Sequence, residues 1–377
     1  MYDLIRPLLF AMDAESAHDI ITGLMASPLG PVVSTLVPMA TRSYPALQQE
    51  LLGRTLPNPV GLAAGLDKHV QLVQMARWLG CGFHEVGAIT AQASQGNPKP
   101  RLFRLPTDHA LINRMGLNNA GAANLKHQLK ALPKDFCVGI NLSKTPQPHI
   151  TGPLALQDFG LALKHALGCG SYISLDVSCP NTADGTTFCQ PDTLAELLAF
   201  LANQQQALLS NHPTQAKPWL VKLSPDLTSD TLAHLVDVAQ PYVDKGLMAG
   251  WVACNTTRTR DNLTTDAQTV EQLGPGGLSG PPVFDKSLAV VRTLYQLTGG
   301  QHLIVGVGGI RDTESAWAYM THGASLIQLY TGLVYEGPGL VERIKAGLDA
   351  KLKQHGLTNI AQAVGLAHRH HPATTSF

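Results

Sequence analysis

Residues 171–181 read SYISLDVSCPN. The first half of this stretch is β-branched and aromatic, which favours a buried strand, and Pro180 cannot continue a central strand because it has no N–H to donate. Cys179 is therefore predicted to lie just beyond the carboxyl end of a strand. A thiol in that place could accept a proton, attack a carbon, bind a metal or fill a gap in the core. The organisation of the remaining chain bears on which of these roles it has.

Similar apolar or β-branched runs recur along the chain, at residues 58–65, 82–89, 137–143, 172–178, 219–224, 250–256, 302–309 and 324–331. Segments with helical periodicity separate them, such as residues 72–79 and the Leu-, Ala- and Gln-rich segment 191–210. This alternation predicts an α/β fold, a parallel sheet closed into a (β/α)8 TIM barrel, with a doubly wound open sheet as the alternative. A barrel carries its active site at the carboxyl ends of its strands.

The amino terminus is predicted to be a small helical extension ahead of the barrel. Apolar residues recur at helical spacing over residues 2–26, with a break near Asp13 to Ser16, where either residue could cap the second helix. Two interpretations stay open: a hairpin packed on the main domain, or an apolar face that lies on a membrane or lines the access path of a lipophilic molecule. The predicted domains are residues 1–44 for the extension and its Pro-rich linker, 45–355 for the barrel and 356–377 for a tail.

Composition excludes several functional classes. With 27 basic and 27 acidic residues the chain has no net charge, which gives no support to nucleic-acid binding. The six cysteines show no zinc spacing, so we expect a reduced cytoplasmic setting and no metal site, and the histidines of the tail are better explained by a disordered end. Asp3 and Arg6 interrupt the apolar start, which argues against a signal peptide, and no run of about 18 apolar residues suggests a membrane span.

Polar groups are predicted to gather where the strands end. Because parallel strands of a barrel end on one face, these groups should converge on a pocket for a flat, hydrogen-bonding, anionic ligand. The residues at the strand ends are Ala64 to Lys68, Ala88, Asn141, Asp176 with Cys179 and Asn181, Lys222, Asn255 with Thr256, Gly308 with Gly309, and Tyr330 with Thr331.

The seventh strand runs straight into a glycine turn, Gly306-Val307-Gly308-Gly309, followed by a helix start at Asp312. Glycines there let backbone N–H groups approach a phosphate, although a plain tight turn is the simpler alternative. Its place after the seventh strand favours the phosphate, and the absence of a GxGxxG motif in an amino-terminal βαβ unit argues against a nicotinamide cofactor. We therefore expect flavin mononucleotide (FMN).

Lys68 and Lys222 are the candidate cationic groups. Lys222 interrupts an apolar run, and a lysine inside a barrel is costly unless it meets an anion. Lys68 follows the first strand and is compatible with the pocket or with a solvated turn. Beside a flavin one lysine would stabilise the anionic reduced ring, and the other would bind a substrate carboxylate.

Longer motifs point to a family. They are Asn58–Lys68, Gly96–Leu105, Leu111–Asn119, Val221–Leu227, Asn255–Thr257, Gly276–Gly280 and Gly306–Ile310. Together they resemble those of the class 2, quinone-linked dihydroorotate dehydrogenases, and the resemblance spans about residues 2 to 345, including the helical start.

The resemblance implies oxidation of dihydroorotate to orotate in pyrimidine synthesis, with FMN in the barrel and electrons leaving to a membrane quinone, so that the protein would be peripheral on the cytoplasmic face of the inner or cell membrane. FMN would be held by Ala64, Gly65, Ala88, Asn141, Asp176, Lys222, Cys254, Gly280, Gly309, Tyr330 and Thr331. The pyrimidine would be held by Lys68, Asn113, Arg114, Met115, Gly116, Leu117, Asp176, Asn181, Asn255 and Thr256. His18 and Arg104 would lie beside the quinone path.

The chain departs from the family at several of these positions. Class 2 members carry Ser as the base where this chain has Cys179, which is similar to the soluble class 1 enzymes. Asp176 stands where the family uses Asn, and an ionised carboxylate cannot donate a hydrogen bond and repels an anionic substrate unless it is protonated or meets Lys222. Ala88 and Cys254 replace threonines, Ser143 replaces a glycine and Leu117 replaces a phenylalanine.

The favoured hypothesis is an FMN oxidoreductase in which Cys179 removes the C5 proton of dihydroorotate, hydride leaves C6 for flavin N5, and Lys222 supports the reduced ring. A thiol has a reference pKa of about 8.5, so it reaches its basic form more easily than a serine. Two alternatives stay open: a divergent paralogue that acts on another dihydropyrimidine or heterocycle, and a flavin-binding barrel without turnover.

Overall fold

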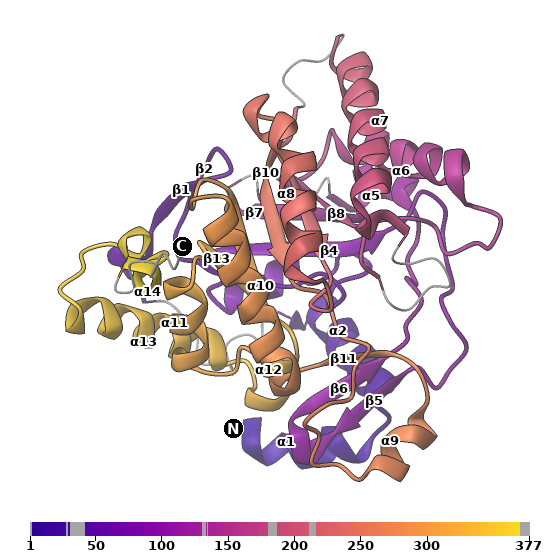
Figure 1. The fold of residues 1–377 in the computed structure, drawn as a ribbon. Coiled ribbons are helices and arrows are strands. Elements are labelled where there is room, and N and C mark those ends of the chain that lie inside the picture. Colours follow the sequence, from indigo (N-terminus) through magenta and orange to yellow (C-terminus); the bar gives the residue numbers. More distant parts are fainter. Residues whose placement is uncertain are drawn as a thin grey trace.

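A barrel of parallel strands forms the centre of the computed structural model, which describes residues 2–27, 29–30, 42–129, 133, 135–179, 187–210 and 216–369. The strands close in the order β10-β12-β13-β3-β4-β7-β8-β9. Figure 1 shows the whole chain, with several of these strands labelled at its centre. They are β3 (Val60–Leu62), β4 (Phe83–Ile89), β7 (Cys137–Ser143), β8 (Tyr172–Asp176), β9 (Trp219–Leu223), β10 (Met248–Ala253), β12 (Leu303–Val307) and β13 (Leu326–Leu329). Each overlaps its predicted range, so the (β/α)8 prediction is confirmed and the open-sheet alternative is wrong.

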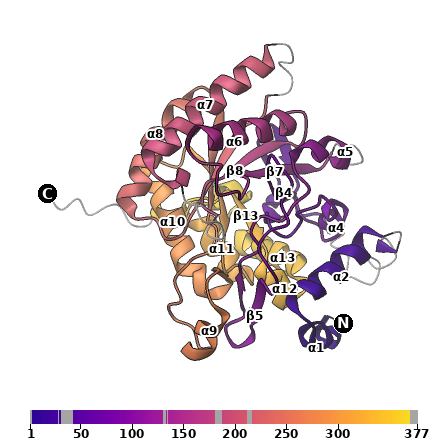
Figure 2. The same ribbon diagram turned by 90° about the vertical axis from the view of Figure 1, so that its right-hand side faces the viewer.

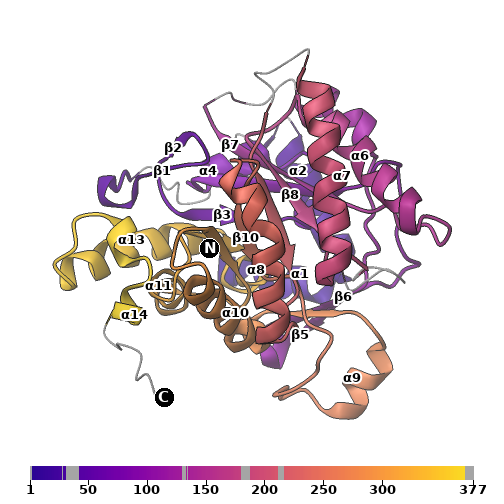
Figure 3. The same cartoon turned by 45° about the horizontal axis from the view of Figure 1, so that its top comes forward.

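Helices surround the barrel, as the view from the right-hand side and the tilted view show (Figures 2 and 3). They are α4 (Val73–Trp78), α5 (Leu125–Leu129), α6 (Gly152–Ala166), α7 (Pro191–Leu209), α8 (Ser229–Asp244), α10 (Phe284–Leu297), α11 (Thr313–Thr321) and α13 (Leu340–Gln354). Short 3₁₀ turns are η1 (Pro45–Leu47), η2 (Pro106–Asp108), η3 (Ala122–Asn124), η4 (Thr187–Cys189) and η6 (Pro281–Val283).

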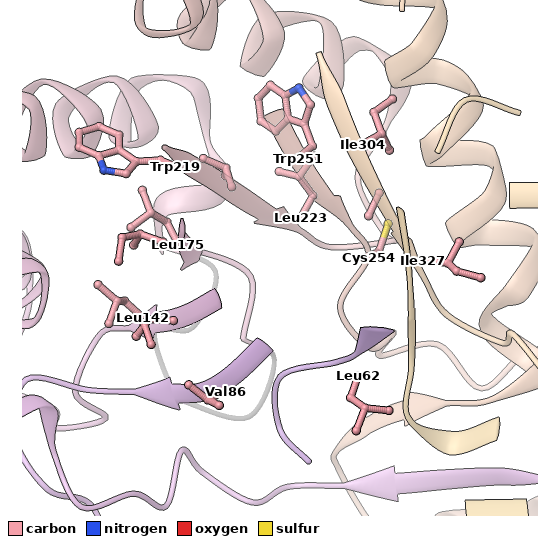
Figure 4. Packing of buried hydrophobic residues seen from close by; sticks show 14 of the residues in the cluster. Leu62, Val86, Leu142, Leu175, Trp219, Leu223, Trp251, Cys254, Ile304 and Ile327 are labelled. Atoms are coloured by element: carbon pink, nitrogen blue, oxygen red, sulfur yellow. The ribbon is translucent and has the colours of Figure 1, made fainter. Parts of the chain in front are cut away.

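The main core lies between strands and helices. Leu142, Leu175, Trp219 and Trp251 take part in this packing (Figure 4). Trp219 and Trp251 are fully buried, and a buried indole N–H needs an acceptor. The Trp219 N–H donates to Gln205 Oε1 at 3.0 Å, and that of Trp251 to His302 Nδ1 at 3.1 Å. Both buried indole N–H groups of this layer are therefore satisfied by side chains within it.

The two ends of the barrel differ. A hairpin of β1 (Gln49–Leu51) and β2 (Arg54–Leu56) supplies Leu56 to an apolar cluster with Phe83 and Leu220 inside the barrel. In the loops that follow strands β4 and β10, an antiparallel sheet forms from β5 (Leu102–Leu105), β6 (Ala110–Asn113) and β11 (Gly277–Ser279), with α9 (Ala267–Leu273) nearby. This sheet was not predicted from the sequence. It covers the end at which the polar groups gather.

The amino-terminal extension forms two helices, α1 (Tyr2–Ala11) and α2 (Ala14–Ala26), as predicted. Asp13 is the cap of α2, because its Oδ1 accepts from the Ser16 N–H at 2.9 Å. The helices lie at the same end of the molecule as β5 (Figures 1 and 2). None of the described helices is long and apolar enough to cross a membrane. Most of the predicted linker, residues 31–41, lies outside the described residues.

The region after residue 355 is more ordered than the predicted tail. It forms η7 (Ile360–Ala363) and α14 (Leu366–Arg369), and Ile360 is fully buried. His368 stacks on Tyr295 with 4.7 Å between ring centroids, and its Nε2 lies 3.2 Å from the His322 carbonyl oxygen. The expectation of a disordered end is thus corrected for His368, while residues 370–377 lie outside the described part of the chain.

Candidate active site

A cavity with about 1040 Å³ of empty volume opens at the carboxyl ends of the barrel strands. The structure brings nearly all predicted cofactor and substrate residues together around it. They are Ala64, Gly65, Lys68, Ala88, Asn113, Met115, Gly116, Leu117, Asn141, Asp176, Cys179, Lys222, Cys254, Asn255, Thr256, Gly280, Gly309, Tyr330 and Thr331.

Two predicted residues are not among the lining residues. Arg114 is turned away, because its guanidinium donates to the carbonyl oxygens of Leu273 and Pro275 and lies over the Phe103 ring. In this conformation its side chain therefore links the segment after β6 to the end of α9 and the segment that follows it, through Leu273 and Pro275. Asn181 lies outside the described residues.

Sequence reasoning missed Asn118 and Gln328, which also line the cavity. Gln328 lies inside the apolar strand β13 and is 1% exposed. The sequence does contain a signal for Gln328: it is a polar residue inside an apolar strand, the same feature that identified Lys222 as a candidate.

Unpartnered acceptors in the cavity wall allow a test of whether the site fits a flavin. Within the part of the chain that the structure describes, four buried side-chain oxygens of lining residues have no hydrogen-bond partner: Asn118 Oδ1, Asn141 Oδ1, Thr256 Oγ1 and Gln328 Oε1. Buried polar atoms are normally hydrogen-bonded, so the site is built for a ligand that brings donors. A flavin ring, which carries an N–H group, fits this requirement.

The glycine turn after β12 provides donors. Within the described residues, the backbone N–H groups of Gly308 and Gly309 donate to no protein acceptor. A Cβ added to Gly309 would lie 2.6 Å from Phe284 Cβ, so the turn is restricted to glycine. Adjacent free N–H groups form an anion-binding concavity that fits the phosphate of FMN.

Two lysines add positive charge. Lys222 is 6% exposed and has no hydrogen-bond or ion-pair partner among the described residues. Lys68 donates from Nζ to the Gly65 carbonyl oxygen at 2.6 Å. Burial lowers the pKa of Lys68 to about 8, although Glu15 and Asp19 oppose the shift. A buried charge without a protein partner indicates an anionic ligand.

The loop that carries Lys68 is held by its neighbour Asp67. The Asp67 carboxylate accepts from the backbone N–H groups of Gln71 and Leu72 at 2.8 and 2.9 Å, and its Oδ2 lies 3.1 Å from His84 Nε2. Burial works to raise the pKa of Asp67, but His84 and the two N–H groups lower it overall. Lys68 therefore projects from a fixed turn.

Asp176 is the centre of a buried polar cluster. Its Oδ1 accepts from Ser178 N at 3.1 Å, Ser178 Oγ at 3.2 Å and Asn255 Nδ2 at 3.1 Å. Burial raises the pKa of Asp176, and Lys222 reduces the shift without cancelling it. Asn255 Oδ1 accepts from Thr256 N, so both ends of this carboxamide are engaged within the protein.

Cys179 lies just past β8 in the cavity wall and is 6% exposed. The loop around it is held in part by Cys189, whose Sγ donates to the Val177 carbonyl oxygen at 3.0 Å. Burial raises the pKa of Cys189 to about 12, so Cys189 is protonated at neutral pH. Of these two thiols, only Cys179 faces the cavity.

A second cavity, with about 1230 Å³ of empty volume, lies between the helical extension and the barrel. Its lining is mostly apolar and includes Leu9, His18 and Arg104. Burial, helped by Lys68, lowers the pKa of His18 to about 4, so His18 is neutral at pH 7. Arg104 donates to the Met12 carbonyl oxygen at 2.8 Å, and its Nε has no hydrogen-bond partner among the residues that the structure describes. Tyr330 lines both cavities, so the two cavities adjoin at this side chain.

Comparison with known proteins gives one consistent result. The family model described as dihydroorotate dehydrogenase matches residues 46–352. The dihydroorotate dehydrogenase (quinone) of Gloeobacter violaceus is 40% identical over 370 residues, which cover 97% of this chain and 99% of the relative. That of Corynebacterium efficiens is 38% identical over 370 residues, 97% of this chain and 93% of the relative. The crystal structure of DHODH in complex with ferulenol from Eimeria tenella is similar, with a TM-score of 0.83 and 32% identity over 94% of this chain and 96% of that chain.

Proposed function

The chain belongs to the dihydroorotate dehydrogenase family, in its quinone-dependent class, and from this premise we propose that it oxidises dihydroorotate to orotate with FMN in the first cavity and a quinone in the second. It is an oxidoreductase of pyrimidine biosynthesis. The observation that carries the proposal is the first cavity itself, in which unpartnered acceptors, free N–H groups and two lysines surround one space. Such a lining complements a ring with N–H groups, a phosphate and a carboxylate.

FMN would be held at its phosphate by the N–H groups of Gly308 and Gly309, and at its ring by Asn141 and Lys222. When bound, FMN supplies the capacity to accept two electrons with a hydride. Lys222 is buried in the cavity lining and would stabilise the negative charge that develops on the reduced flavin ring.

Cys179 is the proposed base, because it is the cavity-facing thiol on the loop after β8. Its Sγ would take the C5 proton of dihydroorotate. Lys68, whose pKa is about 8, is cationic at neutral pH and would bind the substrate carboxylate. The loop with Asn113, Met115 and Leu117 closes over the same space and would exclude water.

The second cavity is the proposed quinone site. Its apolar lining suits a lipophilic ring, and the Nε–H of Arg104 is a donor that no described residue accepts from. Leu4, Leu8 and Ile20 of the helical extension are 80%, 71% and 52% exposed. Exposed apolar residues on amphipathic helices favour peripheral attachment to a membrane, from which a quinone would reach the cavity.

A second candidate keeps the flavin and changes the substrate. Asp176 is an acceptor whose carboxylate already engages Asn255, so neither residue offers a free donor to the oxygens of a pyrimidine in this conformation. A heterocycle richer in N–H groups would match this wall better. The observation favours this candidate only at the substrate, because the FMN and quinone regions are unaffected.

Anaerobic addition of dihydroorotate to the purified protein separates the possibilities. The proposal predicts yellow protein whose flavin absorbance is bleached by dihydroorotate. Yellow protein that is bleached only by another dihydropyrimidine or heterocycle would support the second candidate. Yellow protein that no such donor reduces would indicate a flavin-binding barrel without turnover, and colourless protein that refuses added FMN would contradict all three.

A further inference from the structure

Glu85, on β4, is fully buried inside the barrel and is not among the residues that line the first cavity. Its hydrogen-bond partners are on β7, β8 and β13. In the sheet, β3 separates β4 from β13, and β7 separates β4 from β8. Its bonds to β8 on one side and to β13 on the other place the carboxylate in the barrel interior, in contact with the cavity-lining residues Asn141 and Gln328.

The carboxylate fixes two carboxamides. Glu85 Oε1 accepts from Asn141 Nδ2 at 2.9 Å, and Oε2 accepts from Gln328 Nε2 at 2.9 Å. Oε2 also accepts from the Tyr172 hydroxyl at 3.0 Å. A carboxylate offers only acceptors, so each carboxamide must turn its NH₂ group toward Glu85. Each carbonyl oxygen must then point the other way.

Both residues line the cavity, and we call them its floor. Their carbonyl oxygens, Asn141 Oδ1 and Gln328 Oε1, are buried and have no hydrogen-bond partner among the described residues. Asn141 Nδ2 also donates to Ser174 Oγ at a longer 3.3 Å. Without Glu85 the Asn141 carboxamide would keep only this weaker bond, and either carboxamide could rotate and present an NH₂ group, which would favour a ligand carbonyl instead of a ligand N–H.

We propose that Glu85 is a positioning residue that fixes Asn141 and Gln328 with their carbonyl oxygens toward the cavity, so that the floor selects a ring with an N–H group, and that Gln328 binds this ring directly. The inference rests on the proposed function for the identity of the ring. Oxidised FMN carries one ring N–H, at N3, so selection by the floor must act on that group.

Flavin binding by the full-length chain, stripped of bound flavin, tests this without relying on activity. FMN and 3-methyl-FMN, which lacks the N–H, are titrated and followed by flavin fluorescence. We expect the wild type to bind FMN at least about tenfold more tightly, which corresponds to about 1.4 kcal/mol. Equal affinity of the wild type for the two flavins would overturn the inference, whereas failure to bind either flavin would overturn the proposed function with it.

Variants locate the selection. Gln328→Met removes one carbonyl oxygen, and Glu85→Gln places an NH₂ group among three donors; both are expected to reduce the preference for FMN several-fold. Tyr172→Phe is the comparison variant, because it removes the third bond to Glu85 and a contact of the hydroxyl with Gln328 but leaves both carboxamide bonds to Glu85 in place, so a smaller loss of preference is expected. A preference unchanged in Gln328→Met, or lost equally in Tyr172→Phe, would contradict the assignment even if Glu85→Gln failed to fold.

Discussion

Glu15→Gln is expected to detach the helical extension from the barrel. Glu15 lies on α2 and accepts from Arg101 through three contacts, Nε to both carboxylate oxygens at 3.1 Å and Nη2 to Oε1 at 2.7 Å. The side chains are 6% and 8% exposed. Removing one partner of a buried ion pair leaves the other charge uncompensated and typically costs about 3–5 kcal/mol. The substitution keeps the shape of the side chain, so the loss reports on charge.

The expected functional effect is selective. Because α2 carries His18 and one wall of the second cavity, loosening it should raise the KM for quinone and lower quinone turnover about tenfold or more. The first cavity does not include α2, but Glu15 helps to keep up the pKa of Lys68 against burial. Anaerobic bleaching of the flavin by dihydroorotate should therefore remain close to the wild-type rate when it is measured well below pH 8, where Lys68 stays cationic. Stopped-flow bleaching and steady-state quinone reduction measure the two halves separately.

Lys99→Ala is the matched control. Lys99 Nζ lies 3.2 Å from the same carboxylate, but its side chain is 60% exposed, and exposed pairs contribute about 0–1 kcal/mol. Burial works to raise the pKa of Glu15, yet the bonds from Arg101 and Lys99 lower it overall, so the stabilisation is present above the ordinary pKa and is lost as the pH falls. Wild type and Glu15→Gln should therefore converge in unfolding free energy at acid pH. Equal stability and equal quinone KM at neutral pH would refute this reasoning.

Substitutions at three further positions test the first cavity. Cys179→Ala should slow anaerobic flavin reduction by about 10²- to 10⁴-fold, the usual contribution of a general base, while Cys179→Ser should recover part of the rate at high pH; a rate unchanged in Cys179→Ala would exclude the thiol as base. Lys68 loses its charge above about pH 8, so kcat/KM for dihydroorotate should fall there, and Lys68→Met should abolish that limb of the pH profile; a limb that survives belongs to another group. Asp176→Asn should raise the thermal unfolding midpoint at neutral pH. Burial raises the pKa of the Asp176 carboxyl, so its ionised form destabilises the fold increasingly as the pH rises. The difference in midpoint between variant and wild type should therefore shrink as the pH falls. A midpoint that drops at neutral pH would mean that the hydrogen bonds to Ser178 and Asn255 outweigh the cost of burying the charge.

The barrel could be predicted from the sequence because each strand is a short apolar run bounded by polar or glycine residues. Runs such as Trp219–Leu223 carry their own signal, and a lysine within one indicated an inward-facing site. The same argument applies to Glu85 in β4 and Gln328 in β13, which were overlooked. Polar residues inside buried strands are informative even when no motif surrounds them.

Other features depend on tertiary contacts that periodicity cannot reveal. Strand β11 (Gly277–Ser279) has only three residues, and β6 (Ala110–Asn113) has four. Such short segments show no clear alternation, and their pairing joins parts of the chain that are far apart in the sequence. The engagement of Asn255 by Asp176 likewise follows from the meeting of β8 and the loop after β10. Sequence could place both side chains at one end of the barrel but could not show that they bind each other.

The most direct measurement is the number of orotate molecules formed per flavin under anaerobic conditions, with and without a quinone. The account predicts about one orotate per flavin when no quinone is present, because each flavin accepts one hydride. It predicts continued turnover when quinone is added, because the two cavities share the lining residue Tyr330 and are therefore adjacent. No orotate under either condition, or repeated turnover without an acceptor, would contradict it.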